Sequence, residues 1–383
     1  MEKEKLRGRI DWITTLIPFV IVLSMMLVFM FIPTQSKLFV DTLRGFFGDT
    51  IGIYYVILGI GSVLVSLYLA FKDKYGQIRL GNVDKPVYSN FAWGTMIFTS
   101  TMAADIMFYS LIEWALYGAE PHVAEMGKMQ LWAPTYPLFH WGPLAWGFYV
   151  ILAISFAFMM HVRKRERQRF SEAVRPLLGD RVDGPLGKLI DIVAVFAMVC
   201  ATATTFSLAT PLLASALASV CGISTNVVLT IGILLLICAV YTITVLLGMS
   251  GISKLASFCS YMFFALLFYF LFLGGETRYI LETGFQSLGN MAQNFIGLST
   301  YMDPLRENNF PQNWTIYYWA YWLVWCIATP FFIALISKGR TIKNLVFGTF
   351  GWGLAGTYMS FIILGNYGLA QQMKHGLDVT GYI

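Results

Sequence analysis

The chain has 383 residues, of which 57% are hydrophobic, 16% are aromatic and only 12% are charged, and its mean hydropathy is +0.65. The charged share is about half that of soluble proteins, and neither a disordered nor a nucleic-acid-binding chain carries so many aromatic residues. The composition therefore predicts an all-α, polytopic membrane protein.

Nine apolar runs follow one another along the chain, each long enough to cross a hydrocarbon core of about 30 Å as a helix. The predicted spans are residues 13–33, 51–71, 90–118, 137–161, 189–216, 225–247, 255–274, 314–336 and 344–365.

Lys and Arg gather in every second connection between these spans. Of the 26, 20 lie in residues 1–12, 72–89, 162–188, 248–254 and 337–343. The positive-inside rule then places the N-terminus in the cytoplasm. We expect the protein to lie in the plasma membrane. The run RKRERQR, Arg163 to Arg169, is interpreted as a cytoplasmic anchor rather than as a nucleic-acid-binding patch.

Enzymatic and metal-binding motifs are not found in the sequence. The cysteines have no paired spacing and the four histidines form no ligand pair, so we expect neither disulfides nor a metal site. A Gly-rich phosphate loop, a GxSxG elbow and a Walker pattern are also missing, which argues against an ATP-driven pump and a membrane hydrolase; we expect a protein that is not an enzyme and has no cofactor. The cysteines are Cys200, Cys221, Cys238, Cys259 and Cys326.

The third span has a small, polar middle, TSTMAAD, that ends in Asp105. A carboxylate at that depth costs about 2.5–3.5 kcal/mol on insertion scales, so it should face a wet cavity, a cation or a partner. Three readings stay open: a protonated Asp105 bonding a second helix, close packing of the small residues, and a helix that breaks at a binding site. Glu113, nearer the outer end, is interpreted as interfacial.

The fourth span opens with PLFHWGPLAWGFY, in which Trp146 and Tyr149 share a helix face and Trp141 precedes them. The Gly-Pro pair predicts an irregular helix start. An aromatic belt at the membrane interface is the alternative reading of these rings.

The eighth span opens with WTIYYWAYWLVWC, Trp314 to Cys326. Helical spacing predicts two aromatic stripes, and Trp325 falls about 16 Å into the span, too deep for an interfacial belt. Packing between helices could explain the rings, but so could a cage for a quaternary ammonium group, which offers no hydrogen bonds. The predicted stripes are Tyr318, Trp322 and Trp325, and beside them Trp314, Tyr317 and Tyr321.

These motifs resemble the betaine/choline/carnitine transporter family. The family signature WT-x-x-[FY]W-x-WW reads WTIYYWAYW here, and LFHWGPLAWGFY, SLATPLL, YMDPLRENNFPQNW and SKGRTIKNLVFG resemble further family segments in the same order. The resemblance implies a single transmembrane domain over 1–383 with the inverted-repeat fold of the LeuT-like amino-acid/sodium symporters. It would comprise two extra helices in 13–71, a first five-helix repeat in 90–274 and the first two helices of a second repeat in 314–365. It also implies a homotrimer in the lipid bilayer.

The resemblance assigns a substrate site. Trp141, Trp146 and Tyr149 match the family's fourth-helix aromatics, Tyr321, Trp322 and Trp325 match those of the eighth helix, and Trp319 matches a tryptophan that flanks the pathway. Tyr321 stands where the signature has tryptophan. Asp105 falls where choline-transporting members have aspartate and betaine symporters have glycine, which favours choline, since its bare positive charge would be balanced.

Secondary active transport of choline by alternating access is therefore expected, with glycine betaine or carnitine transport, or a non-transporting membrane binding protein, as alternatives. The coupling ion, Na+ or H+, stays open, although residues 254–264 lack the arginine of the sodium-independent exchangers. Family members have twelve spans, so we expect the nine spans alone not to support ion-driven uptake.

Overall fold

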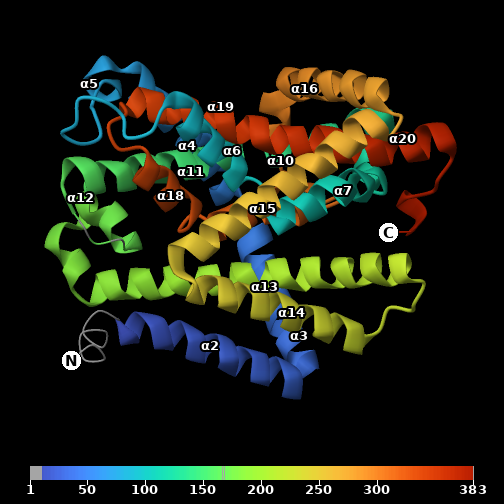
Figure 1. The fold of residues 1–383 in the computed structure, drawn as a ribbon, viewed down its shortest axis with the longest axis horizontal. Helices are drawn as coiled ribbons and strands as arrows, with labels where there is room; N and C mark the ends of the chain where they lie inside the picture. Colours follow the sequence, from blue (N-terminus) through green and yellow to red (C-terminus); the bar gives the residue numbers. More distant parts are fainter. Residues whose placement is uncertain (1–10, 166, 168, 383) are drawn as a thin grey trace. The chain divides into compact units, whose positions relative to one another are not determined.

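The computed structural model describes residues 11–165, 167 and 169–382, and in this part of the chain the backbone is almost entirely helical (Figure 1). Within it, extended pairing is limited to an isolated bridge between Arg79 and Thr341. The predicted all-α fold class is confirmed.

The part of the chain that the structure describes contains seven helical stretches able to cross a membrane, or up to nine if each of two bent helix pairs is counted as one span. The seven are Trp12–Phe31, Ile53–Phe71, Met129–Val162, Pro185–Cys221, Val227–Leu246, Lys254–Leu273 and Ile342–His375, and the pairs are Asn90–Ser100 with Ala104–Gly118 and Pro311–Val324 with Thr329–Ile336. The chain is therefore a multi-pass membrane protein.

The elements of the N-terminal half are α2 (Trp12–Phe31), α3 (Pro33–Gly45), η1 (Phe46–Thr50), α4 (Ile53–Phe71), α5 (Asp73–Gly76), α6 (Asn90–Ser100), α7 (Ala104–Gly118), α8 (Pro121–Glu125), α9 (Met129–Trp132), α10 (Thr135–His140), α11 (Pro143–Ala157), η2 (Phe158–Val162), η3 (Phe170–Val174), α12 (Arg175–Leu178) and η4 (Gly179–Asp183). The remaining elements are α13 (Pro185–Cys221), α14 (Val227–Leu246), α15 (Gly248–Phe268), η5 (Tyr269–Leu273), α16 (Thr277–Thr300), η6 (Pro311–Thr315), α17 (Ile316–Val324), α18 (Thr329–Ile336), α19 (Ile342–Ser360), η7 (Phe361–Gly365), α20 (Asn366–His375) and η8 (Thr380–Tyr382).

Local sequence explains several helix ends. The Asp11 carboxylate accepts a hydrogen bond from the Thr14 amide at the start of α2 (3.3 Å), and Asn226 caps α14 through the Leu229 amide (2.9 Å). Both side chains satisfy amides that have no partner within their own helix. At the other end of a helix, α20 stops at Gly376, whose φ of +69° is readily adopted only by glycine.

The described residues form two compact units, each built from three stretches of the chain. The first unit comprises residues 1–97, 143–202 and 296–352, and the second comprises 98–142, 203–295 and 353–383. The division into repeats at 90–274 and 314–365 stays a prediction.

In the first unit α11 packs against both α4 and α18, and α17 packs against α4 and α11. Gly147 makes the approach of α11 to α4 possible, because a Cβ atom there would lie 2.6 Å from a methyl carbon of Val63. Small residues at helix contacts serve this purpose in membrane proteins.

A second feature of the first unit is the clasp around Arg340, in the turn between α18 and α19. Its guanidinium group donates to the carbonyl oxygens of Tyr88 (3.0 Å) and Ser89 (3.1 Å) and to Asn90 Oδ1 (2.8 Å), and it lies 4.0 Å from the ring centroid of Trp93. The side chain is buried, so these contacts replace its hydration and join the turn to the start of α6.

In the second unit α7 packs against η7, α10 and α20. Trp114 lies against Gly368, where a Cβ atom would come within 2.8 Å of the indole nitrogen. A separate apolar cluster joins α15, α16 and η7 through Phe263, Leu267, Ile280 and Leu364.

Candidate functional site

The third span is broken at residues 101–103, between α6 and α7. Thr101 donates its amide (3.2 Å) and its hydroxyl (2.7 Å) to the Phe98 carbonyl, and Ala103 has extended backbone angles. Of the three readings of this span, the structure contains the helix break. Close packing is present as well, because a Cβ atom at Gly356 would lie 2.5 Å from the Thr101 hydroxyl oxygen.

Asp105 lies directly after this break, in the first turn of α7, and its side chain is 8% exposed. The N-terminus of a helix carries a partial positive charge and amides without partners in their own helix. A carboxylate is therefore less costly there than in the middle of an unbroken helix, which explains how the span accommodates it.

Glu113 is not interfacial, and that expectation was wrong. The side chain is fully buried, and its two carboxylate oxygens accept hydrogen bonds from the Tyr117 hydroxyl (2.6 Å) and the Trp141 indole nitrogen (2.7 Å). Tyr117 and Trp141 thus replace the water that Glu113 would have met at an interface. The Tyr117 hydroxyl also lies 2.5 Å from Nδ1 of the buried His140.

Trp141 occupies the two-residue gap between α10 and α11, so the predicted irregular start of the fourth helix is confirmed. Its ring lies 5.6 Å from Tyr109 and 5.3 Å from Phe361, measured between centroids. The indole is almost completely buried. Its orientation is fixed by the bond to Glu113 and by these two rings.

Trp146 and Tyr149 of α11 and Trp322 of α17 form a cluster of three rings in the first unit. Centroids are 5.7 Å apart for Trp146 and Tyr149, 5.7 Å for Trp146 and Trp322, and 4.7 Å for Tyr149 and Trp322, with interplanar angles of 80°, 62° and 56°. All three side chains are buried. An interfacial belt would leave such rings open to lipid headgroups, so the burial disfavours that reading.

The eighth span is not one continuous helix, contrary to expectation. It ends as α17 at Val324 and resumes as α18 at Thr329, with a bend of 52° between the two parts. Pro330 explains the break, because its ring has no N–H and would clash with the carbonyl of Cys326 in an unbroken helix. Trp325 therefore lies at the C-cap of α17, where its side chain is partly buried.

The predicted aromatic stripes of this span are modified in the structure. Tyr321 stacks on Tyr317 (6.1 Å between centroids), as expected, but Trp314 stacks on Tyr318 (6.4 Å) and so joins the two stripes. Trp319 is fully buried, with its ring 6.3 Å from Phe148 of α11.

The structure thus brings Trp146, Tyr149 and Trp322 into direct contact within the first unit, with Tyr321 and Trp325 on the same helix as Trp322 or at its end. Trp141 and Asp105 belong to the second unit. Among the described residues, His, Cys, Asp and Glu do not gather in a group able to hold a metal ion. Buried π faces, rather than metal-ligating or nucleophilic groups, are what these residues offer.

The fold and the site together define a class of protein: a multi-pass helical membrane protein with buried tryptophan and tyrosine rings. The sequence pattern of the betaine/carnitine/choline family transporters matches residues 13–383. The chain belongs to this family.

Several relatives are similar over most of the chain. A probable glycine betaine transporter from Desulfitobacterium hafniense is 33% identical over 319 residues, which are 82% of this chain and 62% of that protein. An uncharacterized transporter from Escherichia coli, YeaV, is 29% identical (85% and 67%), and a carnitine transporter from Acinetobacter baumannii is 27% identical (83% and 58%). This chain therefore spans only about three fifths to two thirds of the length of these relatives.

Proposed function

We propose that the chain takes part in secondary active transport of a quaternary ammonium compound across the plasma membrane, with choline as the substrate. Family membership supports the class of activity. The site would consist of Trp141, Trp146, Tyr149, Tyr321, Trp322, Trp325 and Asp105.

The observation that carries this proposal is the geometry of the three rings in the first unit. The centroids of Trp146 and Tyr149 lie 5.7 Å apart, so these two aromatic rings are closer together than the 6 Å reach of a cation–π contact. Trp322 is close enough to both Trp146 and Tyr149 to supply a third face. A trimethylammonium group is the ligand that suits such faces, since it carries charge but donates no hydrogen bond.

Asp105 supports choline among the quaternary ammonium compounds. As a member of the proposed site, this buried carboxylate would attract choline's bare cation, whereas it would repel the carboxylate of glycine betaine or carnitine.

The second candidate is transport of glycine betaine or carnitine, which the names of two relatives favour. A membrane protein that binds such compounds without transporting them is the third. We further propose a cytoplasmic N-terminus, from the distribution of Lys and Arg, coupling to Na+ or H+, and the family's homotrimer.

Two measurements on the purified chain test the proposal. Calorimetric titration with choline, glycine betaine and carnitine establishes binding and its order, and counterflow of labelled choline in proteoliposomes establishes transport. We expect choline to bind most tightly and to show counterflow, which, unlike the ion-driven uptake that the nine spans alone should not support, requires no ion gradient. Tighter binding of betaine or carnitine would favour the second candidate, binding without counterflow would favour the third, and no binding of any of the three would refute the cage.

A further inference from the structure

The cytoplasmic end predicted for the fourth span carries a pocket that substrate transport does not explain. After η2 the chain folds back on the end of its own span: the Arg163 amide donates to the Phe158 carbonyl and the Arg165 amide to the Met159 carbonyl, both at 3.0 Å. Arg163 and Arg165 are thereby held against the last turn of a predicted membrane-spanning helix, and the positive-inside rule expects such a cytoplasmic helix end to lie near the lipid headgroups.

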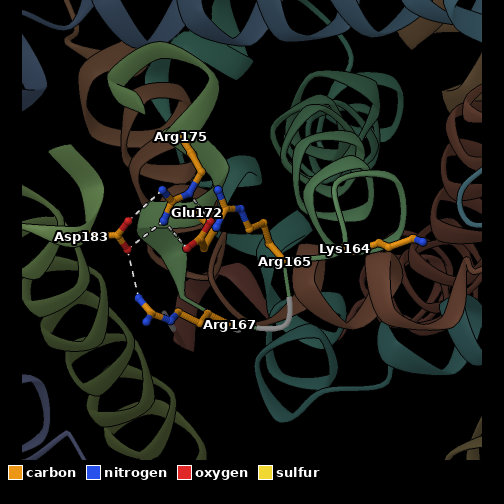
Figure 2. Close-up of a pocket in the computed structure, with 6 residues that line it drawn as sticks. All are labelled: Lys164, Arg165, Arg167, Glu172, Arg175 and Asp183. Atoms are coloured by element: carbon orange, nitrogen blue, oxygen red, sulfur yellow. Dashed lines mark hydrogen bonds and ion pairs between the residues drawn. The ribbon is translucent and has the colours of Figure 1, made fainter. Parts of the chain in front are cut away.

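The pocket has a volume of about 510 Å³, and all of the described residues that line it are charged (Figure 2). They are Lys164, Arg165, Arg167, Glu172, Arg175 and Asp183. Among the described lining residues, four cations accompany two carboxylates, and a third carboxylate, that of Asp180, lies 3.5 Å from Arg175 at the edge of the pocket.

The two carboxylates are already matched within the pocket, as the dashed lines of Figure 2 show. Arg175 is buried and donates to both oxygens of Glu172 (2.6 and 2.7 Å) and to both of Asp183 (2.9 Å each). Arg167 adds a bond of 3.0 Å to Asp183. The hydrogen bonds from Arg175 lower the pKa of Asp183, so this carboxylate stays charged and paired.

Lys164 and Arg165 take part in none of these ion pairs. Over the part of the chain that the structure describes, no carboxylate oxygen lies within 4.0 Å of either side-chain cation. Figure 2 shows the Arg165 side chain extending toward Glu172 and Arg175, while Lys164 points away from them. Two cations held at the membrane boundary beside a matched ion cluster favour an anion as ligand.

An adjoining cavity of about 490 Å³ gives the site an apolar side. It shares Lys164, Arg165 and Arg175 with the first pocket and adds Phe158, Met159, Arg163 and Pro176. A free inorganic anion would gain no binding energy from contact with these apolar side chains. A phospholipid has a charged phosphate and an apolar body next to each other, as these two cavities require.

We propose that Lys164 and Arg165 bind the phosphate of an anionic phospholipid of the inner leaflet, with Phe158, Met159 and Pro176 contacting its glycerol and the start of its acyl chains. Each cation near an anionic membrane surface contributes on the order of 1 kcal/mol. Losing both should weaken lipid binding roughly thirtyfold.

Native mass spectrometry of the full chain in detergent, titrated with phosphatidylglycerol or phosphatidylcholine, tests this proposal. The wild-type protein should retain phosphatidylglycerol in preference to phosphatidylcholine. The double variant Lys164→Gln/Arg165→Gln should lose this preference. The control Lys72→Gln/Lys74→Gln, which removes the same charge elsewhere, should keep it. Lys72 and Lys74 are exposed and lie outside both cavities. Equal phosphatidylglycerol affinity in the two double variants would overturn the proposal.

Competition with inorganic phosphate distinguishes a site for a lipid phosphate from a site for a free phosphate ion. We expect it not to displace phosphatidylglycerol at equal concentration, and displacement would show a site for a free anion instead of a lipid. If the double variant does not fold, the single variants Arg165→Lys and Arg165→Gln test the proposal instead. Only Arg165→Lys should retain phosphatidylglycerol. Equal retention by both variants would again overturn the proposal.

Discussion

The indole nitrogen of Trp141 donates a 2.7 Å hydrogen bond to the carboxylate of Glu113, and both side chains are buried. Glu113 comes from the middle of α7, whereas Trp141 lies in the gap after α10, so the bond fixes one of the proposed substrate-binding rings to a different helix. Glu113 would then act as a positioning residue for Trp141.

Replacing Glu113 tests that role. Glu113→Ala leaves a buried N–H and a buried hydroxyl without this acceptor, so choline affinity should fall roughly tenfold. Glu113→Gln keeps an acceptor oxygen, so its choline affinity should fall by less. The decisive measurement is the same pair of titrations in a Trp141→Phe background, where the effect of Glu113→Ala on affinity should shrink. An undiminished effect there would mean that Glu113 acts on the site by another route.

Trp322→Ala and Trp141→Ala should each weaken quaternary ammonium binding while leaving expression intact. Loss of a desolvated cation–π contact of about 2 kcal/mol corresponds to roughly thirtyfold in affinity. Isothermal titration with choline measures it. Phe268→Leu and Phe272→Leu are the controls, because both rings are more than half exposed and touch each other rather than the proposed site. Wild-type affinities in both tryptophan variants would contradict the cage.

Asp105 sets the expected order of substrates. Asp105→Asn preserves size and the position at the start of α7 but removes the charge, so choline affinity should drop about tenfold if the ion pair contributes about 1.4 kcal/mol. Asp105→Gly should reverse the order by relieving repulsion of betaine. Titrating both ligands on wild type and both variants measures the ratio. A ratio that stays constant across all three proteins would exclude Asp105 as the selectivity residue.

Glu276, between η5 and α16, accepts hydrogen bonds from Lys374 (2.5 Å) and His375 (2.8 Å) of α20. The bond from Lys374, and next that from His375, lowers the pKa of Glu276 below its ordinary 4.5. A lowered folded-state pKa gives stabilisation that is complete above the unfolded-state value and is lost as the pH falls through the folded-state value.

Glu276→Gln should therefore melt a few degrees below wild type at neutral pH, and the gap should close as the pH is taken well below 4.5. Differential scanning fluorimetry in detergent over a pH series measures it. Glu282→Gln is the control, since Glu282 forms an exposed pair with Arg278 that should contribute little at any pH. A gap that is independent of pH would show that ionised Glu276 is not the stabilising species.

Arg340→Lys should destabilise the first unit by about 2 kcal/mol, although it keeps the charge. An ammonium group cannot reproduce the fork that reaches Tyr88, Ser89 and Asn90, nor the planar contact with Trp93. Thermal or denaturant unfolding in detergent measures the loss. Arg181→Lys, the same exchange at an exposed residue, should change nothing measurable. Equal stability of the two variants would contradict the clasp.

The nine spans could be read from the sequence because a bilayer demands about 20 apolar residues in a row, a signal that is local in the chain. The small, polar residues before Asp105 left the break as one of three readings of that span, and the structure was needed to choose among them. The bond between Glu113 and Trp141 was not predicted, since it depends on where the irregular gap after α10 places a side chain 28 residues away.

Pro330 is visible in the sequence and disfavours an unbroken helix, but Pro18 and Pro211 lie inside the continuous helices α2 and α13, so a proline alone does not predict the break after Val324. The clasp of Arg340 on Trp93 joins parts of the chain that no local pattern relates. Orientation in the membrane, the repeats and the choice of substrate stay predictions.

The interruption at residues 101–103 has a consequence for biogenesis. With 11 and 15 residues, α6 and α7 are only about 16 and 22 Å long, so neither reaches across the hydrocarbon core alone. Gly356, which packs against Thr101, is synthesised about 250 residues later. The third span therefore leaves the ribosome before the helix that packs against its break is synthesised, so the contact between Thr101 and Gly356 forms only once α19 is in place.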